Sequence, residues 1–438
     1  MVNFREGVVE VLRRISGWRH NYLHDGSRSP LFRELIDLCW EEYPAIVGSG
    51  HGGGPDVDSA RFSLINLFDS KGIPQSHEEA SDFVDAICDA FNQREAVATY
   101  LCPLDMADDL PVFGFGPCEI RTFTQAELSE LIQLRRLQRR FPKLQLDVSR
   151  LANFHWLVVR DRLPIGKALS HRGGIGAWLD FDMSKDFGAI KPFATTWPRI
   201  VERAVFAVTL QDWESYVQYR DLNWRPFQIP WVYTVLGDPL SAPTFPPSPE
   251  TLSWEPQLMQ DSMGEDVEVE VPLRLRSFDG YEPILEVLTA ERWATIERAE
   301  TAPLFNPATA HFMVRAFRSE GVDEFLSNIS VVEAALGMAS DHGFGLPRPK
   351  IKGKRQGATF RVNRRLGTLV GEPGAGDRYE ALFGLRSGFL HGRRLDDISS
   401  SDRVEARVLA RRVVDRLVDV AAENPNLERD VFLSGLCP

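Results

Sequence analysis

The string YEALFGLRSGFLHGRR occupies residues 379–394 and decides the fold of the C-terminal third of this chain. Its apolar residues recur three and four positions apart, a spacing that predicts a helix over 378–391. Gly392 follows directly, and glycine commonly stands just beyond the end of a helix. Within the string, Arg386 and His391 form an R-x4-H pair. The string therefore predicts a helix that carries a guanidinium and an imidazole near its C-terminal end.

Further amphipathic segments lie on both sides of this helix and show the same apolar spacing. Helices are predicted over Tyr281–Glu300, Asn306–Arg318, Val322–Ala339, Phe360–Val370 and Ser401–Ala422. Several helices joined by short connections pack as a bundle. The sequence therefore predicts an all-α helical bundle over 280–438.

The part of the chain before the bundle mixes both types of element. Residues 1–100 are read as helical, with helices over 31–42 and 77–92, and a capping box at Thr124 predicts another helix to about Arg140. Strands are predicted over 112–115, 119–123, 156–160 and 267–275, the last half-buried, while 199–210 fits either type. The proline-rich stretch 226–256 is interpreted as an irregular connection or linker.

The expected fold class is thus α+β, with a mixed α/β N-terminal region before the all-α bundle. We expect three regions: a mostly helical one over 1–145 with a short strand pair near 112–123, a mixed, aromatic-rich and β-containing one over 146–278, and the bundle over 280–438. The tryptophans of the middle region are interpreted as core residues rather than as platforms for stacking bases.

The composition is that of an ordinary globular chain, with 438 residues, 43% hydrophobic and 26% charged. No cysteine pair has a zinc-ligand spacing, and no stretch of 18 apolar residues occurs. We therefore expect a cytoplasmic protein without a membrane span, and neither a cofactor nor a metal site is predicted.

A basic segment stands out because the whole chain carries a net charge of −12. Residues 342–416 contain 17 Lys and Arg against 8 Asp and Glu, a local net charge of +9. This segregation of sign favours a polyanion partner, and the planar guanidinium of arginine suits phosphates and unpaired bases. The predicted RNA-binding residues are Lys350, Lys352, Lys354, Arg355, Arg364, Arg365, Arg393 and Arg394.

The R-x4-H pair has the chemistry needed to cut RNA without a metal ion. Imidazole can accept a proton from a ribose 2′-OH or donate one to a leaving oxygen at neutral pH. A nearby arginine can hold the phosphate and offset the charge of the transition state. Two other pairs have the same spacing, Arg19/His24 and Arg150/His155, and the spacing alone does not separate the three.

The surroundings of the third pair resemble the Apea-like branch of the HEPN superfamily. Members carry a helical bundle whose penultimate segment reads as an aromatic residue, two residues and then R-S-x-x-x-H-G, as in FGLRSGFLHG at 383–392. Upstream, AHFMVRAF (310–317) and VDEFLSNISVVEAALG (322–337) are similar to the family's helices, with Glu333 at its acidic position. The resemblance covers about 280–425, and DLPVFGFGPCEIRTFTQAEL (109–128) is similar to the family's strand–strand–helix entry.

The resemblance implies metal-independent RNA cleavage at a homodimeric site built from two such motifs, in toxin-like, abortive-infection or antiphage systems. Arg386 would position the phosphate and His391 would act as acid and base. Ser387 departs from the Asn, Asp or His that follows the arginine in many catalytic members. The alternative is therefore a non-catalytic HEPN module that only binds RNA or protein. In the enzyme interpretation, residues 1–275 would sense a trigger or bind a regulatory partner.

Three other patterns point to different chemistry. Pro55-Asp56 and Asp69-Ser70-Lys71 match the PD-x12-DxK spacing of a Mg²⁺-dependent nuclease, although the intervening stretch reads as easily as a helix. His20 and His24 lie one turn apart and could bind a metal, but a solvated helix face explains them as well. The glycine-rich segments at 48–55 and 371–378 lack the Lys-Ser/Thr of a phosphate loop and are interpreted as flexible loops.

Overall fold

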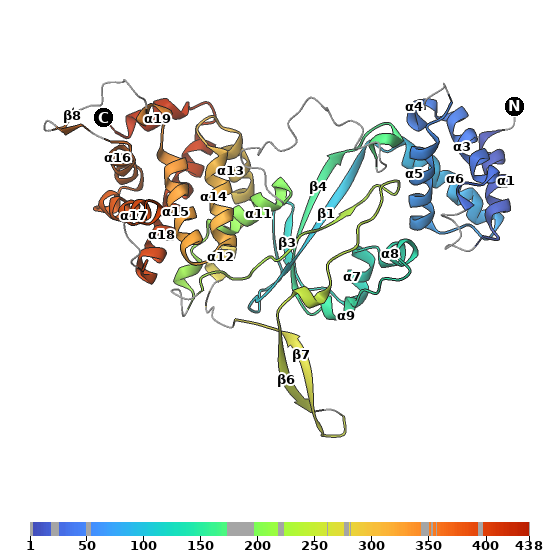
Figure 1. Cartoon of the computed structure of the whole chain (residues 1–438), viewed down its shortest axis with the longest axis horizontal. Coiled ribbons are helices and arrows are strands. Elements are labelled where there is room, and N and C mark those ends of the chain that lie inside the picture. Colours follow the sequence, from blue (N-terminus) through green and yellow to red (C-terminus); the bar gives the residue numbers. More distant parts are fainter. Residues whose placement is uncertain are drawn as a thin grey trace. The chain divides into compact units, whose positions relative to one another are not determined.

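A computed structural model describes the fold of most of the chain. The described residues are 3–18, 26–49, 54–172, 197–217, 223–260, 262–275, 280, 282–342, 350–351, 354–355, 357–392 and 397–437. Helices and strands are mixed among them, which agrees with the α+β class (Figure 1). No described helix is both long enough and apolar enough to cross a membrane.

The chain divides into two compact units that are assembled from non-consecutive segments. Unit 1 comprises Met1–Pro103, Thr122–Ala189 and Pro230–Val271, and unit 2 comprises Leu104–Arg121, Ile190–Ile229 and Pro272–Pro438. The three regions expected from the sequence are consecutive, so this division differs from them.

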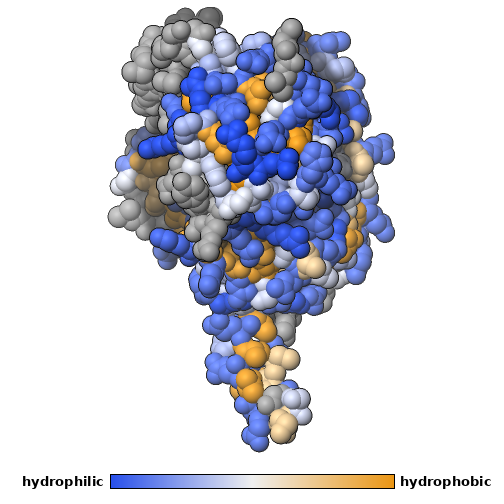
Figure 2. Space-filling model, turned by 90° about the vertical axis from the view of Figure 1, so that its right-hand side faces the viewer, coloured by the Kyte–Doolittle hydropathy of each residue, from blue (hydrophilic) through white to orange (hydrophobic). Residues whose placement is uncertain are grey.

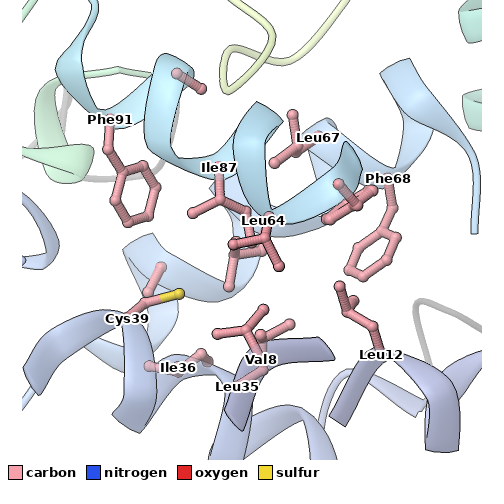
Figure 3. Close-up of a cluster of buried hydrophobic side chains, with 14 of the residues drawn as sticks. Val8, Leu12, Leu35, Ile36, Cys39, Leu64, Leu67, Phe68, Ile87 and Phe91 are labelled. Atoms are coloured by element: carbon pink, nitrogen blue, oxygen red, sulfur yellow. The ribbon is translucent and has the colours of Figure 1, made fainter. Parts of the chain in front are cut away.

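The first part of unit 1 is helical because its apolar residues recur at helical spacing, although α5 (Val57–Lys71) is buried on most sides. Side chains from four helices meet in one core, where Val8, Leu35, Leu64 and Ile87 lie together (Figure 3). Ser76 caps its helix by accepting a hydrogen bond from the Glu79 N–H, 3.1 Å away, which confirms the predicted start at His77. The helices are α1 (Phe4–Ile15), α3 (Pro30–Glu42), α4 (Pro44–Val47), α5 (Val57–Lys71) and α6 (His77–Asn92).

Three strands of unit 1 lie side by side in the order β4-β1-β5, with β1 (Glu95–Leu104) in the middle. β1 pairs antiparallel with β5 (Tyr233–Leu236), so that Ala98 lies opposite Leu236. β4 (His155–Pro164) confirms the strand predicted at 156–160. The helical reading of residues 1–100 is wrong from Glu95 onward, because a strand buried on both faces shows no two-residue alternation that would identify it.

The stretch 226–256 is largely irregular, as expected, but it packs against the rest of the fold and is not a linker. This stretch contributes β5 to the sheet, and its Leu240 lies in the core of unit 1. Asn66 donates a hydrogen bond to the Leu240 carbonyl (2.8 Å), and Arg136 donates one to the Pro239 carbonyl (3.1 Å). A strand fits here because no proline interrupts 231–237.

Short helices cover a second apolar cluster of unit 1, which contains Leu128, Trp156 and Val158. The capping box at Thr124 is confirmed, since the Glu127 N–H donates to its hydroxyl while the Glu127 carboxylate accepts from the Thr124 N–H. The helix predicted from there to Arg140 is interrupted at Gln133, which has a φ of 57°. The elements are α7 (Gln125–Leu131), α8 (Leu134–Arg140), α9 (Val148–Leu151), η2 (Leu169–His171) and η4 (Pro249–Thr251).

Unit 1 also contains a two-stranded hairpin formed by β6 (Trp254–Gln260) and β7 (Asp266–Pro272). The strand predicted at 267–275 is confirmed over 267–272, and of its valines Val267 is exposed while Val269 and Val271 are partly buried. Most residues of both strands are exposed, including Val267. Alternation of apolar and charged residues identified the strand correctly, although no described residue covers its apolar face well enough to bury it.

Unit 2 begins with a short antiparallel hairpin, β2 (Phe113–Phe115) and β3 (Cys118–Arg121), as predicted. Its turn needs glycine at Gly116, which has a φ of 59° and lies against the ring of Trp293. A Cβ atom there would come within 2.4 Å of that ring, so the hairpin can approach α13 (Ala290–Thr301) only through a residue without a side chain.

Helices make up almost all the rest of the described part of unit 2. The segment 199–210 is helical, and the single helix expected over 281–300 is two helices separated near Thr289. The helices are α11 (Arg199–Thr209), α12 (Glu282–Val287), α13 (Ala290–Thr301), α14 (Pro307–Arg318), α15 (Gly321–Leu336), α16 (Ala358–Val370), α17 (Ala375–Leu390), α18 (Ser400–Glu423) and α19 (Arg429–Gly435). The short elements are η3 (Trp213–Ser215), η5 (Ala339–Asp341), β8 (Lys350–Ile351) and β9 (Lys354–Arg355).

A buried network of ionic groups joins α15, α18 and the segment 212–225 inside unit 2. Arg407 contacts Glu324 at 2.8 Å and Glu214 at 3.7 Å, and Arg411 pairs with Glu214. Arg225 lies 3.7 Å from Glu324. The side chains of these five residues are all less than one-tenth exposed, so each charge depends on its partners rather than on water.

Candidate functional site

The R-x4-H pair lies at the C-terminal end of α17. The helix continues to Leu390, and His391 stands at its C-cap, where its N–H donates to the Ser387 carbonyl at 3.2 Å. Gly392 has a φ of 62°, the left-handed conformation in which glycine ends a helix. The helix predicted over 378–391, with its glycine stop, is therefore confirmed.

Arg386 is held by an acid and an aromatic ring. Its Nη2 lies 3.5 Å from Glu333 Oε2 on α15, and its Cζ lies 5.5 Å from the ring centroid of Phe383. The Arg386 side chain keeps 27% of its surface exposed. Burial raises the pKa of Glu333, while the positive charges of Arg386 and His342 act to lower it. Arg386 is thus oriented from one side and still has surface available for a ligand.

Tyr379 lies on the same face of α17, four residues before Phe383 and seven before Arg386. Its side chain is buried, and its hydroxyl makes no hydrogen bond with any described residue. Burial raises the pKa of Tyr379, and the nearby charge of Glu333 raises it further. Tyr379 was not among the site residues predicted from the sequence, although it stands seven positions before Arg386 on the same helix.

His391 is exposed and lies on a different side of the helix from Arg386. Five residues at about 100° each separate the two side chains by roughly 140° around the helix axis, and by roughly 7.5 Å along it. In the described part of the chain, no contact between the side chains of Arg386 and His391 is found. A single copy of α17 therefore presents the guanidinium and the imidazole in divergent directions.

One of the predicted RNA-binding residues is in the interior, which corrects that assignment. Arg365 is 3% exposed and forms a 2.5 Å ion pair with Asp341. It also donates to the carbonyls of Leu336 (2.8 Å) and Leu433 (3.1 Å). Because its guanidinium is satisfied by these groups, Arg365 joins α15, α16 and α19 and cannot reach a nucleic acid in this fold.

The remaining predicted RNA-binding residues are only partly described by the structure. Arg364 is exposed on α16, with its Cζ 6.0 Å from the ring centroid of Phe360. In the β8–β9 ribbon, Lys350 pairs with Arg355 through the backbone, as Ile351 does with Lys354, and the side chains of these strands are not described. The residues outside the described part are Lys352, Arg393 and Arg394.

The basic segment is less basic at its surface than its composition suggests. Arg407 and Arg411 are buried against Glu324, Glu214 and Asp212, acids that lie outside 342–416. On the surface, Arg378 and Arg412 pair with Glu372 inside the segment. A local charge count could not reveal this neutralisation, since several of the partner acids are distant in sequence.

The pairing of Arg365 with Asp341 predicts a specific response to acid. Burial acts to raise the pKa of Asp341, but hydrogen bonds from Arg365, the Met338 N–H and Arg361 outweigh it, so the pKa lies below its ordinary value. A lowered pKa stabilises the fold above the unfolded pKa, about 3.9, and that stabilisation is lost as the pH falls through the folded pKa. We expect the Asp341→Asn variant to be less stable than wild type at pH 7 and the difference to shrink below about pH 4.

Urea unfolding of both proteins between neutral and acidic pH measures this difference. Asp323→Asn, at an exposed site on α15, serves as a control whose effect should stay small. A stability difference that remained constant into acid would show that Asp341 is not an ionised partner.

The alternative sites are not supported by the described geometry. Asp56 caps the N-terminus of α5 and Asp69 lies buried near its other end, 13 residues on, so the two carboxylates are about 20 Å apart along the helix and cannot share one metal ion. Arg150 pairs with Glu250 and Glu270, and His155 is buried at the start of β4. His20 and His24 lie outside the described residues, as does Arg19.

The glycine-rich segment 371–378 is a loop only over 371–374, because α17 begins at Ala375. Gly371 and Gly374, both with positive φ, separate α16 from α17, while only the ends of 48–55 are described. Among the described residues no three His, Cys, Asp or Glu side chains are grouped as metal ligands would be.

A pocket of about 380 Å³ lies between α11 and α14 in unit 2. Its two arginines face carboxylates, with Arg203 2.6 Å from Glu297 and Arg199 3.7 Å from Glu300. Burial lowers the pKa of His311, another lining residue, and the charge of Arg315 lowers it further. The pocket is therefore close to neutral and does not attract an anion by charge.

The chain matches no family model, no curated protein and no solved structure.

Proposed function

We propose that this protein is a metal-independent endoribonuclease of the HEPN type, acting as an effector in phage defence or in a toxin-like system. The proposal rests above all on Arg386, which α17 presents five residues before His391 and which Glu333 orients. The helical bundle of unit 2 and the sequence resemblance around 383–392 support it.

In this proposal Arg386 binds the scissile phosphate. Its contact with Glu333 is long, at 3.5 Å, so a phosphate can compete for the guanidinium. A bound phosphate would gain charge in the transition state, and the adjacent guanidinium would stabilise that charge.

His391 supplies proton transfer. One imidazole accepts the proton of the ribose 2′-OH while the 2′-oxygen forms a bond to phosphorus and the bond to the 5′-oxygen breaks. A second imidazole, from another copy of the chain, donates a proton to that leaving oxygen. The products are a 2′,3′-cyclic phosphate and a 5′-hydroxyl end, and DNA is not cut because it lacks the nucleophile.

The divergence of Arg386 and His391 on one helix favours a site shared by two copies. In a homodimer through the bundle, the histidine of one copy can approach the arginine of the other. Leu390, next to His391, is an apolar residue with half of its side chain exposed, which suits a contact between copies.

The alternative proposal is a HEPN module that binds RNA or protein without cutting. It is favoured by the neutralised arginines of the basic segment and by Ser387 directly after Arg386. A regulatory or trigger partner of the N-terminal region is compatible with either proposal.

Incubation of the purified protein with total RNA in excess EDTA separates these proposals. We expect cleavage that leaves 2′,3′-cyclic phosphate ends, and no cleavage of DNA of the same sequence. Cleavage that requires Mg²⁺, or that also acts on DNA, would contradict the mechanism. RNA binding in a gel-shift assay without cleavage, together with no growth defect on expression, would select the binding module.

A further inference from the structure

The β6–β7 hairpin of unit 1 exposes several large apolar side chains. Leu258 is 71% exposed and Met263, at the turn beside Gly264, is 84% exposed. Met259 and Val267 are also exposed. Figure 2 shows apolar and hydrophilic side chains next to each other along the hairpin. An exposed two-stranded hairpin is only marginally stable in water, so this one requires either an anchor or a partner.

The base of the hairpin is anchored within unit 1. The Arg150 guanidinium lies 4.0 Å from the ring centroid of Trp254 and 2.8 Å from Glu270. Trp254 also packs edge-on against Phe154 and donates a hydrogen bond to the Pro249 carbonyl at 3.0 Å. One end of each strand is therefore held, while the residues towards the turn extend into solvent.

The two faces of the hairpin differ in chemistry. Side chains alternate between faces along a strand, and Arg150 contacts both Trp254 and Glu270, which places these two on the same face. Asp266 and Glu268 share that face with Glu270, so the β7 side of this face is acidic, while Leu258 of β6 lies on the same face as Trp254. The opposite face carries Met259 of β6 and three valines of β7. Those valines are Val267, Val269 and Val271.

The outer edge of β7 is available for pairing. Among the described residues this sheet consists of β6 and β7 alone, so each strand pairs on one side only. Pro256 removes a backbone donor from β6, whereas β7 has no proline before its last residue, Pro272. An unpaired strand edge is a template for an additional strand.

Charge identifies the kind of partner that fits. Residues 254–272 contain six acids and no Lys, Arg or His. A second copy of the hairpin would bring like charges together, and nucleic acids or anionic membranes would be repelled in the same way. A basic polypeptide is attracted, and alternate residues of an added strand lie over the acidic face and the valine face.

We propose that the β6–β7 hairpin is a docking element for a basic, extended segment of another protein, which adds to the β7 edge as a third strand. Its Lys or Arg residues lie beside Asp266 and Glu268, and its apolar residues lie beside the valines. This inference is independent of the ribonuclease proposal, since it concerns unit 1 and needs no catalysis.

The test measures binding of a labelled KVKVKVK peptide to the full-length protein by fluorescence anisotropy. The control peptide KKVVVKK has the same composition and charge but lacks the alternation. We expect the alternating peptide to bind at least about ten-fold more tightly than the control, because only it places lysines on one face and valines on the other. N-methylation of its backbone should abolish binding, since an added strand needs its N–H groups.

Variants of the hairpin complete the test. Asp266→Lys/Glu268→Lys should weaken binding by about ten-fold or more, whereas Glu41→Lys, an exposed charge reversal on α3, should change it less than about two-fold. Equal binding of both peptides, no binding of either, or no effect of N-methylation would overturn strand addition. A wild-type dimer that the double variant dissociates in sedimentation experiments would instead identify a second copy as the occupant.

Discussion

The His391→Ala variant is expected to lose RNA cleavage while keeping its fold. Proton transfer by a positioned side chain contributes about 10²- to 10⁴-fold to a reaction rate, so cleavage should slow by at least about 10²-fold. The fold should survive because His391 is exposed at the end of α17. The measurement is the initial rate of cleavage of a fluorogenic RNA in EDTA, together with the thermal unfolding curve.

A histidine at another exposed helix end provides the matched control. His77 is exposed at the first position of α6 in unit 1, and His77→Ala should leave the rate unchanged. Cleavage that persists at the wild-type rate in His391→Ala would exclude the R-x4-H pair as the catalytic site, even if the protein proved to be a ribonuclease.

The Glu324→Gln variant is expected to destabilise unit 2 by about 3–5 kcal/mol. Glu324 accepts a hydrogen bond from Arg407 and lies 3.7 Å from Arg225, and all three side chains are buried. Removing its charge leaves the buried guanidinium of Arg407 with Glu214 as its nearby acid and that of Arg225 with Glu320. Burying an ion without its partner costs several kcal/mol, far more than the loss of one surface ion pair.

Denaturant unfolding of wild type and variant measures this cost, and a salt bridge on the surface provides the control. Glu405 lies on the same helix as Arg407, pairs with Arg378 at 2.7 Å and keeps 37% of its side chain exposed. Glu405→Gln should cost less than about 1 kcal/mol. If Glu324→Gln cost no more than Glu405→Gln, the network would have to be accessible to water in solution.

Local signals in the sequence were sufficient for most of the helices. The helix starts at Ser76 and Thr124 were predicted correctly. A capping hydroxyl accepts a hydrogen bond from an N–H group of the first helical turn, so it needs no partner from a distant part of the chain. The same holds for α17, whose apolar spacing and Gly392 stop are both local. The helix boundary at Gln133 was missed, since its left-handed conformation has no marker in the sequence.

Strand pairing was predicted less well. β1 was read as helix and β5 as linker, although they are adjacent in the sheet of unit 1 and more than a hundred residues apart in sequence. A strand is stabilised by its neighbours, so its identity depends on which distant segment lies beside it. The β2–β3 hairpin, whose strands are joined by a short turn, was predicted correctly.

The sequence by itself determined the α+β class, most helices of unit 2, and the position of Arg386 and His391 at the end of one helix. These features depend on residues a few positions apart, whose interactions the order of the chain already specifies. Only the tertiary structure decided that Arg365 and Arg407 are buried partners of Asp341 and Glu324, and that Val267 of β7 is exposed. Burial and ion pairing depend on groups brought together from distant segments, so a count of local charge or apolar residues cannot reveal them.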